Sequence, residues 1–318
     1  MRSTTSIKAT TTLREVPPAH QPRKNARARE DALGYFLLLP TFSVLAVLIF
    51  WPLLMVFWDS LQNKTFLSSA YRFVGFDNYR GLLTSAPFWA LVLRSLVWTV
   101  SSVVLQVVAG LIMALFVNQS FRGRAVVRGL FLLPWVIPVV VVTVIWKWLL
   151  NDLYGLASFI LERIYPPWAH LPWFADPVLA LPTLIAINVW RGAPFAMVML
   201  LAGLQTVPRE LLEAARIDGA NRFQQFLHVT IPHLRRILII LVLVFGLFNF
   251  NNFDLIFLTT QGGPLDRTMT LPVKTYEIAF KGLQVGTSSA LAVMMLALLA
   301  IFSSVYLNLA GIKRYGRT

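Results

Sequence analysis

The chain alternates long apolar stretches with shorter polar segments. Six stretches are nearly free of Asp, Glu, Lys and Arg, and each has the roughly 20 residues that a helix needs to cross a bilayer. They cover residues 32–58, 88–117, 129–150, 178–203, 237–258 and 286–311. The pattern predicts an all-α integral membrane protein with six transmembrane helices.

The composition supports this fold class. Hydrophobic residues make up 57% of the chain and charged residues only 13%, with a mean hydropathy of +0.67, whereas about a quarter of residues are charged in a soluble domain. Cysteine is absent from the 318 residues. This excludes disulfide scaffolds, cysteine-ligated metals and thiol nucleophiles.

The distribution of positive charge predicts the orientation. The formal net charge is +14. If the N-terminus lies inside, 18 Lys and Arg residues fall in the inner segments and seven in the outer ones. Because cytoplasmic loops carry the excess of Lys and Arg, both termini are expected in the cytoplasm. The charge is thereby explained without a nucleic-acid partner, for which the basic loops offer no aromatic platform.

Three regions are expected. Residues 1–31 are rich in Thr, Ala, Pro and Arg, and predict a disordered, basic cytoplasmic tail. Residues 32–311 form the six-helix transmembrane domain, and residues 312–318 form a short basic cytoplasmic tail.

The cytoplasmic loop 206–236 is long enough to carry a function. Thr206, an early Pro and an early acid predict a helix start, and Gly219 predicts its end. Asn221 and Gln224 have the spacing of a capping box for a second helix, with Pro232 near the end of that helix. The loop is therefore expected to be a helix-turn-helix that docks in a partner's cleft.

The same loop resembles a family signature. Glu213, Ala214 and Ala215 are followed after three residues by Gly219, and after nine more by Val229-Thr-Ile-Pro232. This is similar to the EAA motif of binding-protein-dependent ABC-transporter permeases, with conservative changes at Val229 and Ile231. The resemblance implies that Glu213, Ala214, Ala215, Gly219 and, inside the motif, Asp218 couple the chain to an ATPase.

A simpler interpretation of Glu213 is an ion pair with Arg209 or Arg216 on an interfacial helix. The chain has no phosphate-binding loop of the G-x-x-x-x-G-K-[ST] type. We therefore expect no enzyme activity and no cofactor in this chain, with ATP and Mg bound by a separate ATPase. His228 and His233 lack the spacing of a helical metal site, so neither a catalytic nor a metal site is predicted.

Polar residues inside the apolar stretches predict a cavity, because a charge at mid-membrane must face a cavity or a partner. In the fourth stretch Asn188, Arg191, Gly192 and Phe195 have the i, i+3, i+4, i+7 spacing of one helix face. Gly192 and Pro194 together predict a kink that exposes a backbone carbonyl.

The fifth stretch has Phe245, Asn249 and Asn252 on one face. Asn251 and Asp254 fall on a different face, so one helix is not expected to aim all four polar groups into one cavity, and the role of Asp254 stays open. An alternative is that the amides only join packed helices. Two other charges, Arg94 and Lys147, lie nearer helix ends and are expected to reach the membrane surface.

Amides, a guanidinium and aromatic rings suit a polyhydroxylated ligand such as a sugar. Asn188-x-Trp190-x-Gly192-x-Pro194-Phe195 resembles the segment that lines the sugar site in the larger permease of maltose-type transporters, with Arg191 in place of an apolar residue. Residues 250–253 and 258–264 are similar to the same family's fifth-helix end and outer loop. The resemblance implies substrate contacts from Asn188, Trp190, Gly192, Phe195, Asn249 and Asn252, to which the helix face adds Arg191.

This family resemblance implies a permease subunit of an ATP-driven sugar importer in a bacterial cytoplasmic (inner) membrane, and a substrate such as maltose or trehalose. The implied partners are a second homologous permease that completes a heterodimer, two ATPase subunits, an extracytoplasmic sugar-binding protein and membrane lipid. Two alternatives are an ion-coupled sugar carrier and a membrane-embedded enzyme acting on lipid-linked glycans. The first predicts paired mid-membrane acids, and the second predicts clustered carboxylates or a metal motif.

Overall fold

The computed structural model describes residues 24–68, 71–166 and 170–310. These residues are mostly helical, with isolated β-bridges and no named strand. The α-helices are α1 Lys24–Leu45, α2 Trp51–Ser60, α3 Asp77–Leu83, α4 Ala86–Asn118, α5 Arg124–Val136, α6 Val139–Leu149, α7 Leu156–Ile164, α8 Ala180–Gln205, α9 Arg209–Ile217, α10 Arg222–Gln225, α11 Ile231–Phe250, α12 Asp254–Thr260, α13 Leu271–Tyr276 and α14 Val285–Leu309. Three π-helical segments join neighbouring helices, at Ala46–Phe50, Phe226–Thr230 and Glu277–Lys281.

The chain divides after Leu54 into two compact units. In the first unit α1 begins at Lys24, which lies inside the predicted N-terminal tail. The Ala, Arg, Glu and Lys residues there are strong helix formers. Residues 1–23 and 311–318, which hold the rest of the predicted tails, lie outside the described residues.

The six predicted apolar stretches correspond to five long apolar helices and one bent pair in the described residues. The bent pair is α5 and α6, which meet at 97° where one spanning helix was predicted over 129–150. Ile137 is extended, with φ −67° and ψ 129°, and Pro138 follows it. Because a proline disfavours the helical conformation of the preceding residue, the helix ends there.

The fifth stretch also differs from its prediction. The apolar helix begins earlier, at Arg222, and α11 ends at Phe250 rather than at residue 258. Asn251 and Asn252 interrupt it before α12 begins at Asp254. Asparagine side chains compete for backbone hydrogen bonds and are poor helix formers, which explains the position of the break.

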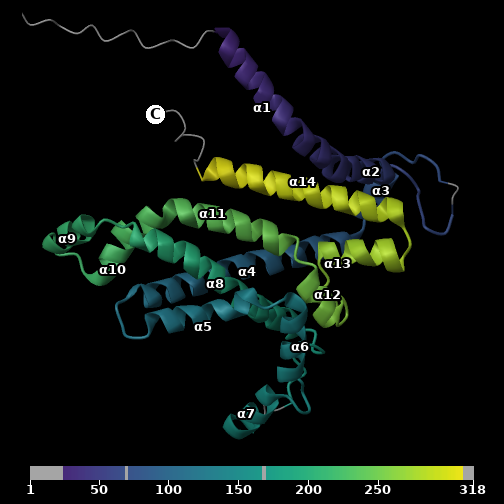
Figure 1. Cartoon of the computed structure of the whole chain (residues 1–318). Helices are drawn as coiled ribbons and strands as arrows, with labels where there is room; N and C mark the ends of the chain where they lie inside the picture. Colours follow the sequence, from purple (N-terminus) through teal and green to yellow (C-terminus); the bar gives the residue numbers. More distant parts are fainter. Residues whose placement is uncertain (1–23, 69–70, 167–169, 311–318) are drawn as a thin grey trace, which may run out of the picture. The chain divides into compact units, whose positions relative to one another are not determined.

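Helices α4, α8 and α11 form the centre of the second unit (Figure 1), with α9 and α10 at one end and α12 and α13 at the other. Helix α4 packs closely on α8 at Gly110. A Cβ added there would lie 2.9 Å from the carbonyl oxygen of Ala193 and from the backbone nitrogen of Met197. Helix α8 itself stays helical through Gly192 and Pro194, so the kink predicted there produces no helix break.

A buried amide cluster joins the three central helices, and we define it as Gln106 of α4, Asn188 of α8 and Asn249 of α11. Asn249 Nδ2 donates to Gln106 Oε1 at 2.8 Å, and Asn188 Nδ2 donates to Asn249 Oδ1 at 2.6 Å. Gln106 Nε2 donates to the Asn188 carbonyl at 3.0 Å. The three side chains are no more than 3% exposed. Apolar clusters lie on both sides, so the amides satisfy one another in the middle of the core.

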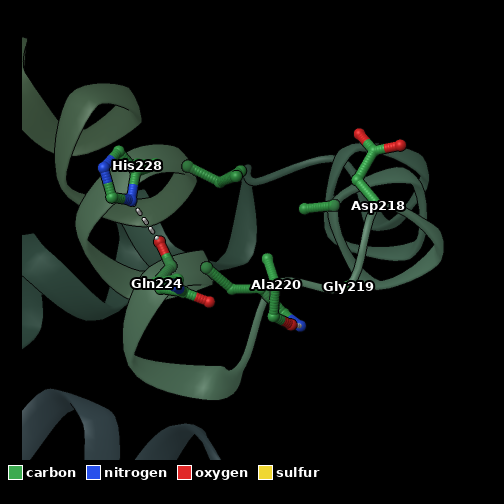
Figure 2. Close-up of a pocket in the computed structure, with 8 residues that line it drawn as sticks. Asp218, Gly219, Ala220, Gln224 and His228 are labelled. Carbon is green, nitrogen blue, oxygen red and sulfur yellow. Dashed lines mark hydrogen bonds between the residues drawn. The ribbon is translucent and has the colours of Figure 1, made fainter.

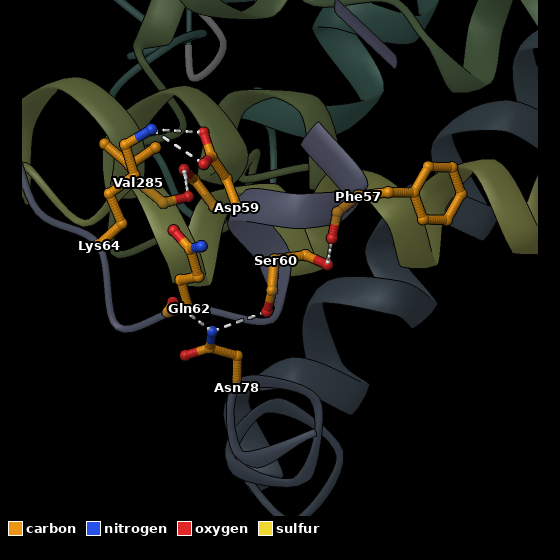
Figure 3. Close-up of polar contacts among 8 residues, drawn as sticks. Phe57, Asp59, Ser60, Gln62, Lys64, Asn78 and Val285 are labelled. Carbon is orange, nitrogen blue, oxygen red and sulfur yellow. Dashed lines mark hydrogen bonds and ion pairs between the residues drawn. The ribbon is translucent and has the colours of Figure 1, made fainter. Parts of the chain in front are cut away.

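The segment that follows α2 is fixed to α3 and to the start of α14 (Figure 3). Asn78 Nδ2 donates to the carbonyls of Ser60 and Gln62 at 2.8 and 2.9 Å, and Lys64 pairs with Asp59 at 2.9 Å. The backbone nitrogen of Gly286 donates to the Lys64 carbonyl at 2.9 Å. These bonds order the loop that connects the first and second apolar helices.

The close approach at Gly110 generates a stability prediction. Gly110→Ala should lower the free energy of unfolding by about 1–3 kcal/mol, because the added methyl meets backbone atoms that have little room to move. Thermal unfolding of the purified protein measures this. Gly129→Ala in α5 is the matched control, since its Cβ meets nothing within 4 Å. An equal melting temperature for both variants would contradict the packing described.

The amide cluster generates a second prediction. Asn249→Ala leaves Gln106 Oε1 and Asn188 Nδ2 buried without these partners, and each orphaned group costs about 1–3 kcal/mol. The variant should therefore melt well below the wild type. Asn251→Ala is the control, because Asn251 is exposed and its amide donates only to the Leu247 carbonyl. If both variants melt alike, the cluster does not hold the helices together.

Candidate functional site

A cavity of about 990 Å³ opens beside the amide cluster. Its lining combines amides, two charged side chains and aromatic rings, drawn from α4, α5, α6, α8, α11 and the start of α12. The lining residues are Gln106, Trp135, Val139, Asn188, Arg191, Gly192, Phe195, Val244, Phe245, Leu247, Phe248, Asn249, Asn251, Asn252, Phe253 and Asp254. The volume lies at the upper end of the range for small-molecule sites.

The structure brings six of the seven predicted substrate residues to this cavity. Those on α8 are Asn188, Arg191, Gly192 and Phe195, and the other two are Asn249 and Asn252. Trp190 is the exception, because its ring packs edge-on against Trp146 with 5.4 Å between ring centroids. It lies two residues after Asn188, which is about 200° around the helix and away from the cavity face.

The expectation that Asn251 and Asp254 face elsewhere was wrong, since both line the same cavity as Asn249 and Asn252. That expectation assumed one continuous helix over the four residues. Because α11 ends at Phe250 and residues 251–253 are not helical, the backbone turns and the helical spacing no longer applies. The helix break therefore adds a carboxylate and an amide to the cavity.

The hydrogen bonds divide the polar lining into two classes. Both Asn249 amide hydrogens are used, one by Gln106 and the other by the Phe245 carbonyl at 2.9 Å. Asn249 therefore fits the alternative in which amides join packed helices. Asn252 makes one long contact of 3.5 Å, to Asn188 Oδ1, and Arg191 Nε is buried with no hydrogen-bond partner. These two side chains retain capacity for a ligand.

Gln106 was missed by the sequence analysis, which searched the second stretch for charges alone. A glutamine in the middle of an otherwise apolar helix is itself a signal. Gly192 leaves space for the Gln106 side chain, because an added Cβ would lie 2.7 Å from Gln106 Cδ. The glycine thus positions an amide, which is a different role from the predicted contact with substrate.

Aromatic side chains form an apolar wall of the cavity. The Phe195 ring lies 5.6 Å from Trp135 and 5.9 Å from Phe245, centroid to centroid. Such flat surfaces pack against the C–H faces of a sugar ring, while amides and charges bind its hydroxyls. The cavity therefore has both kinds of surface that a polyhydroxylated ligand requires.

A second feature is the elbow, which we define as α9, α10 and the turn between them (Figure 2). Gly219 has φ +83°, a conformation that favours glycine, and a hydrogen bond from Ala220 N to the Ala215 carbonyl closes α9. The predicted capping box is confirmed, because Asn221 and Gln224 exchange bonds of 2.8 and 2.9 Å. A small cavity of about 290 Å³ lies inside the elbow, lined among others by Asp218, Gly219 and Ala215.

The five predicted coupling residues lie on this elbow, and Glu213, Ala214, Asp218 and Gly219 are exposed while Ala215 is half-buried. In the described part of the chain Glu213 has neither an ion pair nor a side-chain hydrogen bond. The ion pairs in that part join Lys64 to Asp59 and Lys274 to Glu277. The alternative pairing with Arg209 or Arg216 is therefore not formed.

Two details of the predicted elbow were wrong. Thr206 is the C-cap of α8 rather than the N-cap of α9, and its hydroxyl donates to the Gly203 carbonyl at 2.8 Å. Pro232 lies at the start of α11, because the second helix continues through a π-helical turn into the apolar helix. The wider turn, in which Ile231 N bonds to the Phe226 carbonyl, gives room for a proline ring inside a helix.

Arg94 contacts the loop that follows α12. Its Nε donates to the Met269 carbonyl at 3.2 Å, and its side chain lines a small cavity with Asp266. Arg94 therefore fixes the loop that follows α12. Lys147, in the last turn of α6, is exposed.

The sequence matches known proteins over most of its length. Residues 106–311 match the family model described as binding-protein-dependent transport system inner membrane component. The chain is 32% identical over 286 residues to the permease protein MalF of the trehalose/maltose transport system of Thermococcus litoralis, covering 90% of this chain and 96% of MalF. It is 31% identical over 293 residues to DasB, a permease protein of the diacetylchitobiose uptake system of Streptomyces coelicolor, covering 90% and 89%.

The fold has close counterparts among solved structures. A chain of a bacterial ABC transporter that imports the acidic polysaccharide alginate superimposes with a TM-score of 0.78 at 20% identity, covering 91% of this chain and 98% of the other. A second structure, of an alginate transporter in complex with a periplasmic protein bound to alginate pentasaccharide, gives the same TM-score with 93% and 99% coverage. At this identity the likeness establishes the fold.

Together these matches show that the chain is a multi-pass membrane protein and to which family it belongs. The family model covers more than half of the chain, and relatives above 30% identity cover most of it. Several of those relatives are named as permease proteins of sugar transport or uptake systems. The chain therefore belongs to the family of binding-protein-dependent transport system inner membrane components, as a sugar permease of the larger maltose-type kind.

Proposed function

We propose that this chain forms one half of the sugar pathway in an ATP-driven importer, with the cavity between α8 and α11 as its substrate site. The observation that carries the proposal is the pairing, in one chain, of this polar and aromatic cavity with an exposed elbow. A stand-alone carrier has no need for the elbow. A sugar site needs the mixture of hydrogen-bonding and flat apolar surface that lines the cavity.

The proposed substrate is an α-linked disaccharide such as maltose or trehalose. The Thermococcus relative is named for trehalose and maltose, and a Bacillus subtilis relative at 32% identity is named for maltodextrin. Arg191, Asn252 and Phe195 are the proposed direct contacts, and Asn188, Gly192 and Asn249 hold the wall in place. Trp190 acts only by packing behind that wall.

The proposed assembly is a heterodimer with a second homologous permease in a bacterial cytoplasmic membrane, with both termini inside. Two ATPase subunits bind ATP and Mg below it, and an extracytoplasmic sugar-binding protein delivers the substrate from outside. The elbow docks in a cleft of one ATPase subunit through Glu213, Ala214, Ala215, Asp218 and Gly219.

In this proposal a continuous helix transmits motion of the elbow to the cavity. The helix that begins at Arg222 continues into α11, whose end at Phe250 adjoins the cavity. Closure of the ATPase dimer on ATP binding moves the elbow and tilts α11 against α4 and α8. The amide cluster lies at the crossing point, so the tilt changes access to the sugar.

The coupling assignment generates a charge-reversal prediction. Glu213→Lys should lower sugar-stimulated ATP hydrolysis by about tenfold or more, because it reverses the charge of a residue proposed to dock in the ATPase cleft. ATP hydrolysis and sugar uptake in proteoliposomes measure this. Glu162→Lys on α7, at the opposite side of the membrane, is the matched exposed control. Normal uptake by Glu213→Lys would reject the coupling role.

The assembly is tested by gentle purification of the chain from its native membrane, followed by mass spectrometry. The proposal expects an ATPase and a second six-helix permease, the latter in equal amount, and ATP-dependent uptake of trehalose or maltose after reconstitution. A chain that purifies alone and still transports sugar would overturn the importer assignment in favour of an ion-coupled carrier.

A further inference from the structure

Two opposite charges line the cavity, Arg191 from α8 and Asp254 from the start of α12. Among the described lining residues they are the charged ones, so the lining has a formal net charge of zero. No ion pair joins them, since the ion pairs found in the described residues lie elsewhere. Each charge is therefore available to a ligand.

The two charges are positioned by different elements. Asp254 is the first residue of α12 and is exposed. The guanidinium of Arg191 has a buried Nε without a hydrogen-bond partner. Leaving a buried N–H donor without an acceptor costs free energy, which indicates that a ligand atom accepts a hydrogen bond from Nε.

The amides have less hydrogen-bonding capacity left for a ligand than the two charged side chains have. Both amide hydrogens of Asn249 donate within the protein, and Gln106 and Asn188 bond to each other and to Asn249. Arg191 remains as a strong donor and Asp254 as a strong acceptor in the same lining. A hydroxyl group serves both, because its oxygen accepts from a guanidinium and its hydrogen donates to a carboxylate.

Resting on the proposed function, we infer that Arg191 and Asp254 form a charge-balanced pair that selects uncharged, hydroxyl-rich sugars and disfavours sugars with a carboxylate or an ammonium group. An acidic sugar that pairs with Arg191 faces the uncompensated Asp254, and an amino sugar meets the reverse problem. Like charges brought together in a binding site repel each other, which weakens binding of the mismatched sugar. The residue pair thus acts as a filter for net charge.

The test uses the complete importer in proteoliposomes with the same binding protein throughout. Uptake of radiolabelled trehalose, or of labelled maltose if the importer prefers it, is competed by three disaccharides: a neutral one, an alginate-derived acidic one and a de-acetylated chitobiose. Because the binding protein is constant, a change in competitor order between variants reports on the cavity.

Asp254→Asn makes the lining net positive and should strengthen competition by the acidic disaccharide about tenfold relative to the neutral one. Arg191→Gln makes the lining net negative and should favour the amino disaccharide by a similar factor. The double variant restores zero net charge, and should return the wild-type order with weaker uptake. Arg191→Lys and Asp254→Glu keep both charges and serve as controls that should leave the order unchanged.

If Asp254→Asn and Arg191→Gln leave the competitor order unchanged, or shift it in the same direction, the filter is overturned while the importer assignment stands. If no variant and no wild-type preparation takes up any sugar on addition of ATP, the proposed function fails and the filter fails with it. If a charge-neutralising variant does not assemble, the test uses the double variant that exchanges the two charges, Arg191→Asp with Asp254→Arg. If this variant keeps the wild-type competitor order, the filter is supported. If it loses the preference for neutral sugar, the filter is overturned.

Discussion

The structure depends on one constraint, which is that amides placed in the middle of an apolar bundle must hydrogen-bond to one another. Gln106, Asn188 and Asn249 meet this constraint across α4, α8 and α11 with bonds of 2.6–3.0 Å. Glycines permit the necessary approach, at Gly110 for the helix backbones and at Gly192 for the Gln106 side chain. Because amides bond at defined distances and angles, the cluster fixes the register of the three helices more narrowly than apolar packing does.

The second constraint concerns backbone groups. Non-helical backbone at membrane depth is tolerated where it is covered by protein or lines a cavity. The chain has such breaks at Ile137–Pro138 and at residues 251–253, and both lie next to cavity-lining residues, Trp135 and Val139 in the first case and Asn252 in the second. The breaks therefore coincide with the site. The break after α11 also brings Asp254 into the same lining as Arg191.

Much of this architecture was predictable from the sequence, because it follows from local rules. Apolar length located the membrane helices, and the Asn221–Gln224 spacing located the second helix of the elbow. Helical spacing placed Asn188, Arg191, Gly192 and Phe195 together correctly on α8, which stays helical there. The same rule failed on α11, where the helix ends at Phe250. The bend before Pro138 and the position of Trp190 also follow from local rules, which were not applied to these residues. The role of Gln106 depends on its partners on neighbouring helices, which a pattern along one chain does not include.

The central claim is that the cavity beside the amide cluster is the path of the sugar. The absence of native cysteine allows this to be measured with one reporter, Asn252→Cys, in the assembled and transport-active importer. We expect a small maleimide to label this position and saturating sugar to slow the labelling. An exposed site outside the cavity lining, Phe116→Cys on α4, should show no such protection. Equal labelling of Asn252→Cys with and without sugar, in a preparation that still transports it, would contradict a sugar path through this cavity.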